Sequence, residues 1–371
     1  MKAYLRTFGC RANQYDTEAV RAMIEASGGE IVATPDEADL AVFNSCAVTA
    51  AAEADLRQSV RRAARRAPAL RTVVMGCAAA RDDGRIAALP TVERVVAGGD
   101  LLGVAEAIGL AAPALPPDVQ TGTRALLRIQ DGCDEHCTFC ATRLARGAAR
   151  SRSIVALVNE AQRLADHHPE IVLTGIHIGH YGVDTNTTLS VLVERLMRDI
   201  PRVRFRLSSL EATEVDDRLR ELFAEADRLA PHLHAPLQSG SDAVLKRMGR
   251  HWYKAASYAT AVERIAASVP VFGLGADVIA GFPGETEDDH RCTVALAESL
   301  PFTYLHVFPY SVRPGTPAER LPGHVAASTT ERRAAELRTV AEQRAPAHRA
   351  SRSGGECVLV VMGTAARREG L

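Results

Sequence analysis

The chain has 371 residues, of which 47% are hydrophobic and 24% are charged, and its net charge is −1. The length is typical of a protein of at least two domains, and the composition is that of a globular rather than a disordered chain. The net charge excludes a polycation, so any nucleic-acid contact must come from local patches. No stretch reaches the roughly 18 apolar residues of a membrane helix, and the start has no secretory pattern. We therefore expect a cytoplasmic protein without a membrane partner, in which eight cysteines favour metal binding or catalysis over disulfides.

The first part of the chain, residues 1–110, alternates short β-rich runs with helical stretches. Strands are expected at 2–8, 40–44, 71–76 and 92–97, and helices at 14–26 and 53–66. This alternation predicts an α/β domain with an open parallel sheet, similar to a Rossmann domain. Residues 111–123 then break the periodicity with prolines and predict a linker.

A second and longer alternation occupies residues 124–350. Strands are expected at 124–130, 171–175, 203–208, 232–237, 271–280 and 303–309, with helices at 154–167, 189–199, 216–227 and 288–299 and a closing helix at 328–348. Six βα units predict a partial (β/α)6 version of the eight-unit TIM barrel, whose active residues lie on the loops after the strands. One more strand is expected at 357–362.

Three cysteines with C-x3-C-x2-C spacing, Cys133, Cys137 and Cys140, follow the first strand of this second domain. Thiolates are the usual ligands of iron–sulfur clusters, and a [4Fe–4S] cube needs four of them. Three ligands leave one iron open, and that iron can chelate S-adenosylmethionine. A structural zinc site would normally close with a fourth Cys or His. The spacing therefore favours a radical S-adenosylmethionine cluster over a zinc knuckle or buried thiols.

Three further cysteines, Cys10, Cys46 and Cys77, each directly follow a predicted strand of the first domain. Loops after neighbouring parallel strands gather at one edge of a sheet, where ligands bind. Buried structural cysteines are common, but the repeated placement favours a second cluster. Cys292 and Cys357 match neither group and are expected to be ordinary buried thiols.

Six segments of the chain resemble the methylthiotransferase family of radical S-adenosylmethionine enzymes, over about residues 2–345. They are 7–18 (TFGCRANQYDTE), 44–49 (NSCAVT), 129–140 (IQDGCDEHCTFC), 231–248 (PHLHAPLQSGSDAVLKRM), 277–286 (DVIAGFPGET) and 306–316 (HVFPYSVRPGT). Residues 13–18 and 54–55, followed by an arginine-rich helix, resemble the branch that modifies N6-threonylcarbamoyladenosine (t6A) beside the anticodon of tRNA.

This resemblance implies an activity. One S-adenosylmethionine would be cleaved at the cluster of Cys133, Cys137 and Cys140 to a radical that removes hydrogen from C2 of the adenine at tRNA position 37. Sulfur carried at the second cluster would be inserted there with a methyl group from a second S-adenosylmethionine, giving ms2t6A. The protein would orient and shield these cofactors, and it would need a sulfur donor and an electron donor such as flavodoxin or ferredoxin.

Residues at the strand ends of the barrel are candidates for binding S-adenosylmethionine. They are Gly175, Ser208, Ser209, Glu211, Gln238, Ser239, Gly281 and Gly284. Each has a plainer alternative role, because glycines serve turns and serines cap helices.

Contact with tRNA is expected from two places. In the arginine-rich helix, Arg57, Arg61 and Arg65 recur every four residues and share one face, which can neutralise phosphates or simply be solvated. The family normally ends in a β-barrel RNA-binding domain (TRAM), and residues 351–371 resemble only its opening strands, which predicts a truncated remnant.

Two groups of alternatives remain open. The substrate could be isopentenyl-adenosine of tRNA or an aspartate of a ribosomal protein, as in the sister branches. A protein of another class, a non-catalytic iron–sulfur RNA-binding protein, would retain the cysteines without the reaction.

Overall fold

The computed structural model describes residues 1–111, 118–269 and 272–351. Its first domain is built on one parallel sheet. The sheet has the strand order β2 (Glu30–Ile31), β1 (Lys2–Thr7), β3 (Leu40–Ser45), β4 (Arg71–Gly76) and β5 (Val92–Ala97). All four predicted strands are confirmed; the sequence did not reveal β2 because it has only two residues.

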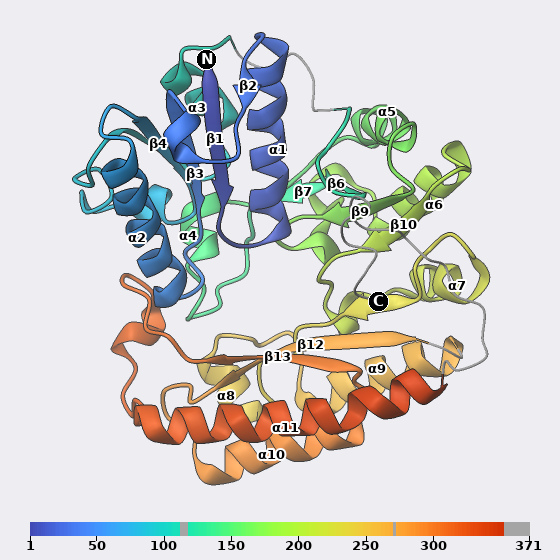
Figure 1. Ribbon diagram of the computed structural model, residues 1–371. Coiled ribbons are helices and arrows are strands. Elements are labelled where there is room, and N and C mark those ends of the chain that lie inside the picture. Colours follow the sequence, from blue (N-terminus) through green and yellow to red (C-terminus); the bar gives the residue numbers. More distant parts are fainter. Residues whose placement is uncertain (112–117, 270–271, 352–371) are drawn as a thin grey trace.

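Helices cover both faces of this sheet (Figure 1). Helices α1 (Arg11–Ala26) and α3 (Leu101–Ile108) pack on one face, and α2 (Ala50–Arg66) packs on the other. Alternate residues of β3 serve the two cores, with Val42 on the α1 side and Phe43 on the α2 side. The Rossmann-like arrangement predicted for this part is confirmed.

The second domain is a partial barrel of six parallel strands. Three of them form one sheet, in the order β10 (Arg204–Leu207), β9 (Glu170–Thr174) and β6 (Arg124–Arg128). The other three form a second sheet, in the order β11 (His232–His234), β12 (Gly273–Ala280) and β13 (Tyr304–Pro309). Isolated bridges such as Ser209–His234 join the two sheets. Its helices are α5 (Ile154–Ala165), α6 (Leu189–Asp199), α7 (Asp217–Glu225), α8 (Asp242–Arg247), α9 (Ala255–Ser268), α10 (Glu287–Ser299) and α11 (Ala327–Ser351).

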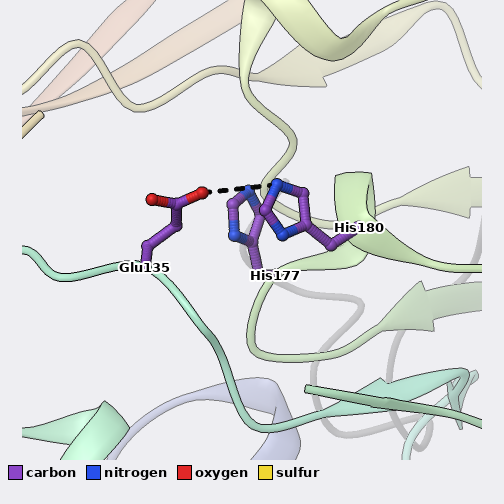
Figure 2. A group of neighbouring side chains, drawn as sticks. All are labelled: Glu135, His177 and His180. Atoms are coloured by element: carbon purple, nitrogen blue, oxygen red, sulfur yellow. Dashed lines mark ion pairs between the residues drawn. The ribbon is translucent and has the colours of Figure 1, made fainter. Parts of the chain in front are cut away.

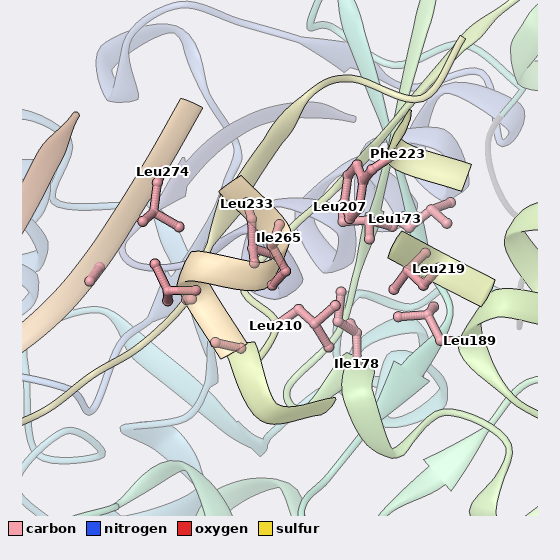
Figure 3. Close-up of a cluster of buried hydrophobic side chains, with 14 of the residues drawn as sticks. Leu173, Ile178, Leu189, Leu207, Leu210, Leu219, Phe223, Leu233, Ile265 and Leu274 are labelled. Carbon is pink, nitrogen blue, oxygen red and sulfur yellow. The ribbon is translucent and has the colours of Figure 1, made fainter. Parts of the chain in front are cut away.

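The barrel has a single large apolar core between its strands and outer helices. Figure 3 shows Leu173 of β9 and Leu207 of β10 facing Leu219 and Phe223 of α7. Burial of such side chains contributes about 25 cal/mol per Å² of apolar surface removed from water. This core holds the strand ends that carry the candidate site.

Several elements were not predicted. Helices α8 and α9 fall where no helix was expected, and the hairpin β7 (Gln130–Asp131)–β8 (Arg150–Ser151) and α4 (Thr142–Arg146) surround the C-x3-C-x2-C loop. The proposed strand at 357–362 and residues 352–371 of the predicted TRAM-like remnant lie outside the described residues, as do residues 112–117 of the predicted linker. Across the described ranges, we find no helix with the length and apolar character needed to cross a membrane.

A buried ion-pair network joins the two domains. The carboxylate of Asp16 in α1 binds the guanidinium groups of Arg128 and Arg146, and its contact with Arg146 Nη2 is 2.7 Å. Nearby, the Tyr15 hydroxyl donates to Glu160 at 3.0 Å. These contacts fix α1 against the start of the barrel.

Candidate active site

The C-x3-C-x2-C loop lies between β7 and α4, directly after the first barrel strand, as predicted. The Cys133 amide donates to the Gly147 carbonyl at 3.0 Å. Gly132 has φ +73°, and a Cβ there would lie 1.9 Å from the Ala148 carbonyl oxygen, so only glycine fits this turn. The loop is therefore held by its own backbone on the rim of the barrel.

A histidine pair lies beside the first thiol. His177 Nδ1 is 3.6 Å from Cys133 Sγ, and its Nε2 is 2.7 Å from Glu214 Oε1. Burial would lower the pKa of His177, but its contacts with Cys133 and Glu214 raise that pKa to about 10. Figure 2 shows His180 stacked on His177 and paired with Glu135. Both ring nitrogens of His177 thus have partners, and one of them is a thiol.

A buried arginine lies beside the second thiol. Arg250 Nη1 is 3.6 Å from Cys137 Sγ, and the guanidinium pairs with Glu211 and lies over the ring of Trp252. Trp252 Nε1 also donates to Glu211, at 2.8 Å. Burial raises the pKa of the Cys137 thiol to about 12. The thiol is therefore protonated at neutral pH unless it binds a metal.

The second group of cysteines gathers around Asn13. The Sγ atoms of Cys10 and Cys77 lie 3.7 and 3.8 Å from Asn13 Oδ1. Asn13 Nδ2 donates to the carbonyls of Phe8 and Ser45, which orients the amide. Cys46 lies alongside, because a Cβ at Gly9, the residue before Cys10, would be 2.9 Å from Cys46 Sγ. The structure thus brings the three strand-end thiols together, as expected from the parallel sheet.

One cavity lies between the two domains and reaches both groups. Its volume is about 380 Å³, and it is lined by Cys10 of the second group and by all three cysteines of the C-x3-C-x2-C loop. Its lining includes aromatic side chains, among them Phe139 and Tyr310. Both groups of thiols therefore border the same cavity.

The spacing of the thiols distinguishes an iron–sulfur cluster from zinc. Four ligands around one zinc ion at 2.3 Å would hold their sulfur atoms about 3.8 Å apart. In two groups of the described residues, three possible ligand atoms lie within 4.8 Å of one another, as a single metal ion would require. These groups are Glu135–His177–His180 and His234–Asp277–His306, and neither contains a cysteine. The described cysteines are all free of disulfides. Open sets of three thiols fit a [4Fe–4S] cube with one open iron better than a single zinc ion.

The residues predicted to bind S-adenosylmethionine divide into two sets. Four line the cavity: Gly175, Ser209, Glu211 and Gln238. Gln238 has φ +62°, a conformation that side-chain-bearing residues rarely adopt and that is frequent at functional sites. The other four are not part of this lining. Ser208 is buried, Ser239 pairs with Thr293, and Gly281 and Gly284 occupy turns with positive φ.

The arginine face of α2 is only partly free. Arg57 pairs with Glu53 at 3.8 Å, whereas Arg61 and Arg65 are exposed and have no ion pair with a described residue. Of the three arginines predicted to contact phosphate, Arg61 and Arg65 therefore carry a positive charge that no described acidic residue pairs with.

The sequence did not reveal His177 and Arg250, which contact the thiols from loops far along the chain, or Glu214, which pairs with His177. One expectation is wrong: Cys292 is exposed rather than buried, because α10 packs through His290, Thr293 and Ala297 and Cys292 lies off that face. Cys357 lies outside the described residues.

Sequence comparisons match both domains and most of the chain. Residues 2–98 match the uncharacterized protein family UPF0004, and residues 127–297 match the radical SAM superfamily. A threonylcarbamoyladenosine tRNA methylthiotransferase of Rickettsia prowazekii is 36% identical over 85% of this chain and 77% of its own length. Its counterpart in Bacillus subtilis is 36% identical over 91% of this chain and 79% of its length.

A relative named for another substrate matches this chain, and so does a protein of known structure. A tRNA-2-methylthio-N(6)-dimethylallyladenosine synthase of Magnetococcus marinus is 32% identical over 99% of this chain and 90% of its length. The radical S-adenosylmethionine methyltransferase TsrM of Kitasatospora setae has the same fold, with a TM-score of 0.65 and 14% identity over 86% of this chain and 75% of its own. The matched domains imply an iron–sulfur cluster and S-adenosylmethionine as cofactors. The chain belongs to the radical S-adenosylmethionine methylthiotransferase family.

Proposed function

We propose that this protein methylthiolates C2 of N6-threonylcarbamoyladenosine at position 37 of tRNA, converting t6A to ms2t6A with two S-adenosylmethionine molecules per turnover. The single observation that carries the proposal is the cavity shared by Cys10 and the C-x3-C-x2-C loop. Hydrogen removal and sulfur insertion must occur at the same carbon, so both groups must reach one substrate. The names of the Rickettsia and Bacillus relatives support t6A as that substrate.

We assign a [4Fe–4S] cluster to each group of thiols. Cys133, Cys137 and Cys140 would hold the first, and Cys10, Cys46 and Cys77 the second. When bound, the first supplies the electron that cleaves S-adenosylmethionine and the second carries the sulfur. The remaining side chains act around them: Arg250 donates a hydrogen bond to the sulfur of Cys137, and His177 Nδ1 lies within hydrogen-bond distance of the sulfur of Cys133.

Binding of S-adenosylmethionine is assigned chiefly to the four predicted residues on the cavity. Ser209 and Glu211 offer polar atoms, Gly175 lets backbone approach closely, and Gln238 presents a side chain held by an unusual backbone conformation. Ser208, Ser239, Gly281 and Gly284 would shape the loops that carry these groups. Because Arg250 and Trp252 both contact Glu211, its carboxylate is positioned before the cofactor arrives.

The proposal requires three partners. The tRNA would contact Arg57, Arg61 and Arg65 of α2, with the two unpaired arginines contributing most. An electron donor such as flavodoxin or ferredoxin and a separate sulfur donor would complete the reaction.

Nucleoside analysis tests the substrate. In a strain that lacks this protein, tRNA digests should lose ms2t6A and gain t6A, and a plasmid copy should restore the product. Loss of the methylthio derivative of isopentenyl-adenosine with ms2t6A intact would instead assign the protein to the other tRNA branch. If neither nucleoside changes, the tRNA proposal is wrong.

Iron content tests the number of clusters. Anaerobic reconstitution should give about eight irons per chain, four for each cube. Cys46→Ala should reduce this to about four and retain cleavage of S-adenosylmethionine, whereas Cys137→Ala should abolish cleavage. Loss of cleavage in Cys46→Ala would contradict two separate sites.

A further inference from the structure

Three adjacent strands of the barrel place polar side chains on one face of their sheet. His234 is the last residue of β11, Asp277 lies in β12 and His306 lies in β13. Asp277 is paired with His306 across the strands, and His234 is paired with Gly275, two residues before Asp277. Alternate residues of a strand face the same side, so the two imidazoles and the carboxylate meet.

The two faces of β12 differ in character. Leu274, Ala276 and Val278 belong to the apolar core, whereas the alternate residue Asp277 lines the cavity that the cysteines border. Only 24% of the Asp277 side chain is exposed. A carboxylate removed from water is costly unless it is paired or coordinates a metal ion. The partners of Asp277 therefore indicate what this face of the sheet can bind.

Three possible metal ligands converge here. Asp277 Oδ1 lies 2.9 Å from His234 Nε2 and 3.4 Å from His306 Nδ1, and all three atoms lie within 4.8 Å of one another. Two neighbouring ligand atoms, each bound at about 2.1 Å to one ion, are about 3.0–3.4 Å apart in octahedral or tetrahedral geometry. Both distances from the carboxylate thus match those between neighbouring ligands of a single ion.

A tyrosine holds one of the imidazoles from its other side. The Tyr304 hydroxyl lies 3.1 Å from His234 Nδ1, the ring nitrogen that does not contact Asp277. A metal-binding histidine usually donates its second N–H to an oxygen atom, which fixes the orientation of the ring. A Cβ at Gly275 would lie 2.0 Å from Tyr304 Cζ, so only glycine leaves room for this ring. The support for His234 is therefore built into the sheet.

The other group of converging ligand atoms is already engaged. It lies beside the C-x3-C-x2-C loop and contains His177, whose two ring nitrogens contact Cys133 and Glu214. The group on β11, β12 and β13 contains no residue with a role assigned above. The side chain of His306 is 57% exposed, which gives an ion a path from solvent to this group.

We propose that His234, Asp277 and His306 bind a divalent transition-metal ion such as Zn²⁺ or Fe²⁺, at a site separate from both groups of cysteines. Two imidazoles and one carboxylate suit these ions, whereas Mg²⁺ and Ca²⁺ prefer oxygen ligands alone. Three protein ligands leave positions of the ion open for water, and Asp277 places the ion at the edge of the cavity. The site does not depend on which adenosine is the substrate.

Manganese EPR of the reconstituted protein, freed of loosely bound metal with a chelator, tests this site. Mn²⁺ binds imidazole and carboxylate but has little affinity for thiolates, and oxidised [4Fe–4S] clusters give no EPR signal. Wild type should bind about one Mn²⁺ per chain, and an equivalent of Zn²⁺ should displace it, because Zn²⁺ binds such ligands more tightly. His306→Phe and Asp277→Asn should raise the Kd for Mn²⁺ more than about a hundredfold, and Tyr304→Phe about tenfold.

An exposed histidine outside both groups provides the matched control. His167→Phe should leave the Kd for Mn²⁺ unchanged. The iron content of every variant should equal that of wild type, which shows that the fold and the clusters are intact. If wild type binds neither Mn²⁺ nor, by elemental analysis after gel filtration, Zn²⁺, the inference is overturned and these side chains form a hydrogen-bonded network only.

The variants also locate the ion. Binding that persists in both His306→Phe and Asp277→Asn would place it elsewhere and overturn the inference. Loss of binding in His180→Asn alone would assign the ion to the group beside the C-x3-C-x2-C loop, which would also overturn it. Loss in the two ligand variants with an unchanged Kd in Tyr304→Phe would support the site and overturn the positioning role of Tyr304.

Discussion

Replacing Asp16 by alanine should strongly destabilise the contact between the two domains. Asp16 and Arg146 side chains are both 0% exposed, and the change leaves the buried guanidinium groups of Arg146 and Arg128 without their main partner. Removing one member of a buried ion pair costs about 3–5 kcal/mol. Arg146 retains Asp131 at 3.3 Å and Asn13 Oδ1 at 2.9 Å. We therefore expect the lower end, about 3 kcal/mol.

Calorimetry of the metal-free protein measures this effect. A loss of about 3 kcal/mol corresponds to about 6–12 °C in Tm for a domain of 150–250 residues. Asp36→Ala is the matched control, because it breaks an ion pair with Arg66 whose side chains are 38% and 55% exposed. Exposed pairs contribute about 0–1 kcal/mol. A shift for Asp16→Ala no larger than that for Asp36→Ala would refute the reasoning.

Three further changes have defined outcomes. His177→Phe removes the hydrogen-bond partner of Cys133 and should lower the reduction potential of the cluster by about 59 mV, which is about a tenfold fall in the ratio of reduced to oxidised cluster in an EPR titration. His180→Asn changes a residue with no hydrogen bond to a described thiol and should leave the potential unchanged. Burial lowers the pKa of His232 to about 3, so stability present above pH 6.5 is lost as pH falls toward 3. His232→Gln should therefore reduce the pH dependence of the free energy of unfolding, measured by urea denaturation, by up to about 1.4 kcal/mol per pH unit. Replacing both Arg61 and Arg65 by alanine should flatten the slope of log affinity for tRNA against log salt by about 1.4–1.8, and an unchanged slope would mean a merely solvated helix face.

The sequence predicts the parts of this molecule that depend on local pattern. Strand ends could be placed from β-rich runs, and in a parallel sheet they lie at one edge, so the meeting of Cys10, Cys46 and Cys77 followed without a structure. The six barrel strands followed for the same reason. Helix α8 was missed because it has only six residues, whereas α9 could have been found, since its buried residues Tyr258, Val262 and Ile265 recur at helical spacing.

Contacts between distant segments could not be predicted. Asp16 meets Arg146 across 130 positions, and Cys137 meets Arg250 across 113. Neither pair carries a spacing that singles it out among 44 basic and 45 acidic residues. Such partners are selected by which loops the packed core brings together, and this information lies in the tertiary structure.

The first two turns of α1 connect the features that this reaction would need to coordinate. Cys10 precedes the helix, Asn13 binds two thiols through its Oδ1 and Asp16 binds the barrel through Arg146. A movement of α1 must therefore shift Cys10 and Asn13 together, while the C-x3-C-x2-C loop stays with the barrel. It follows that Asp16→Ala should reduce methylthiolation more than cleavage of S-adenosylmethionine.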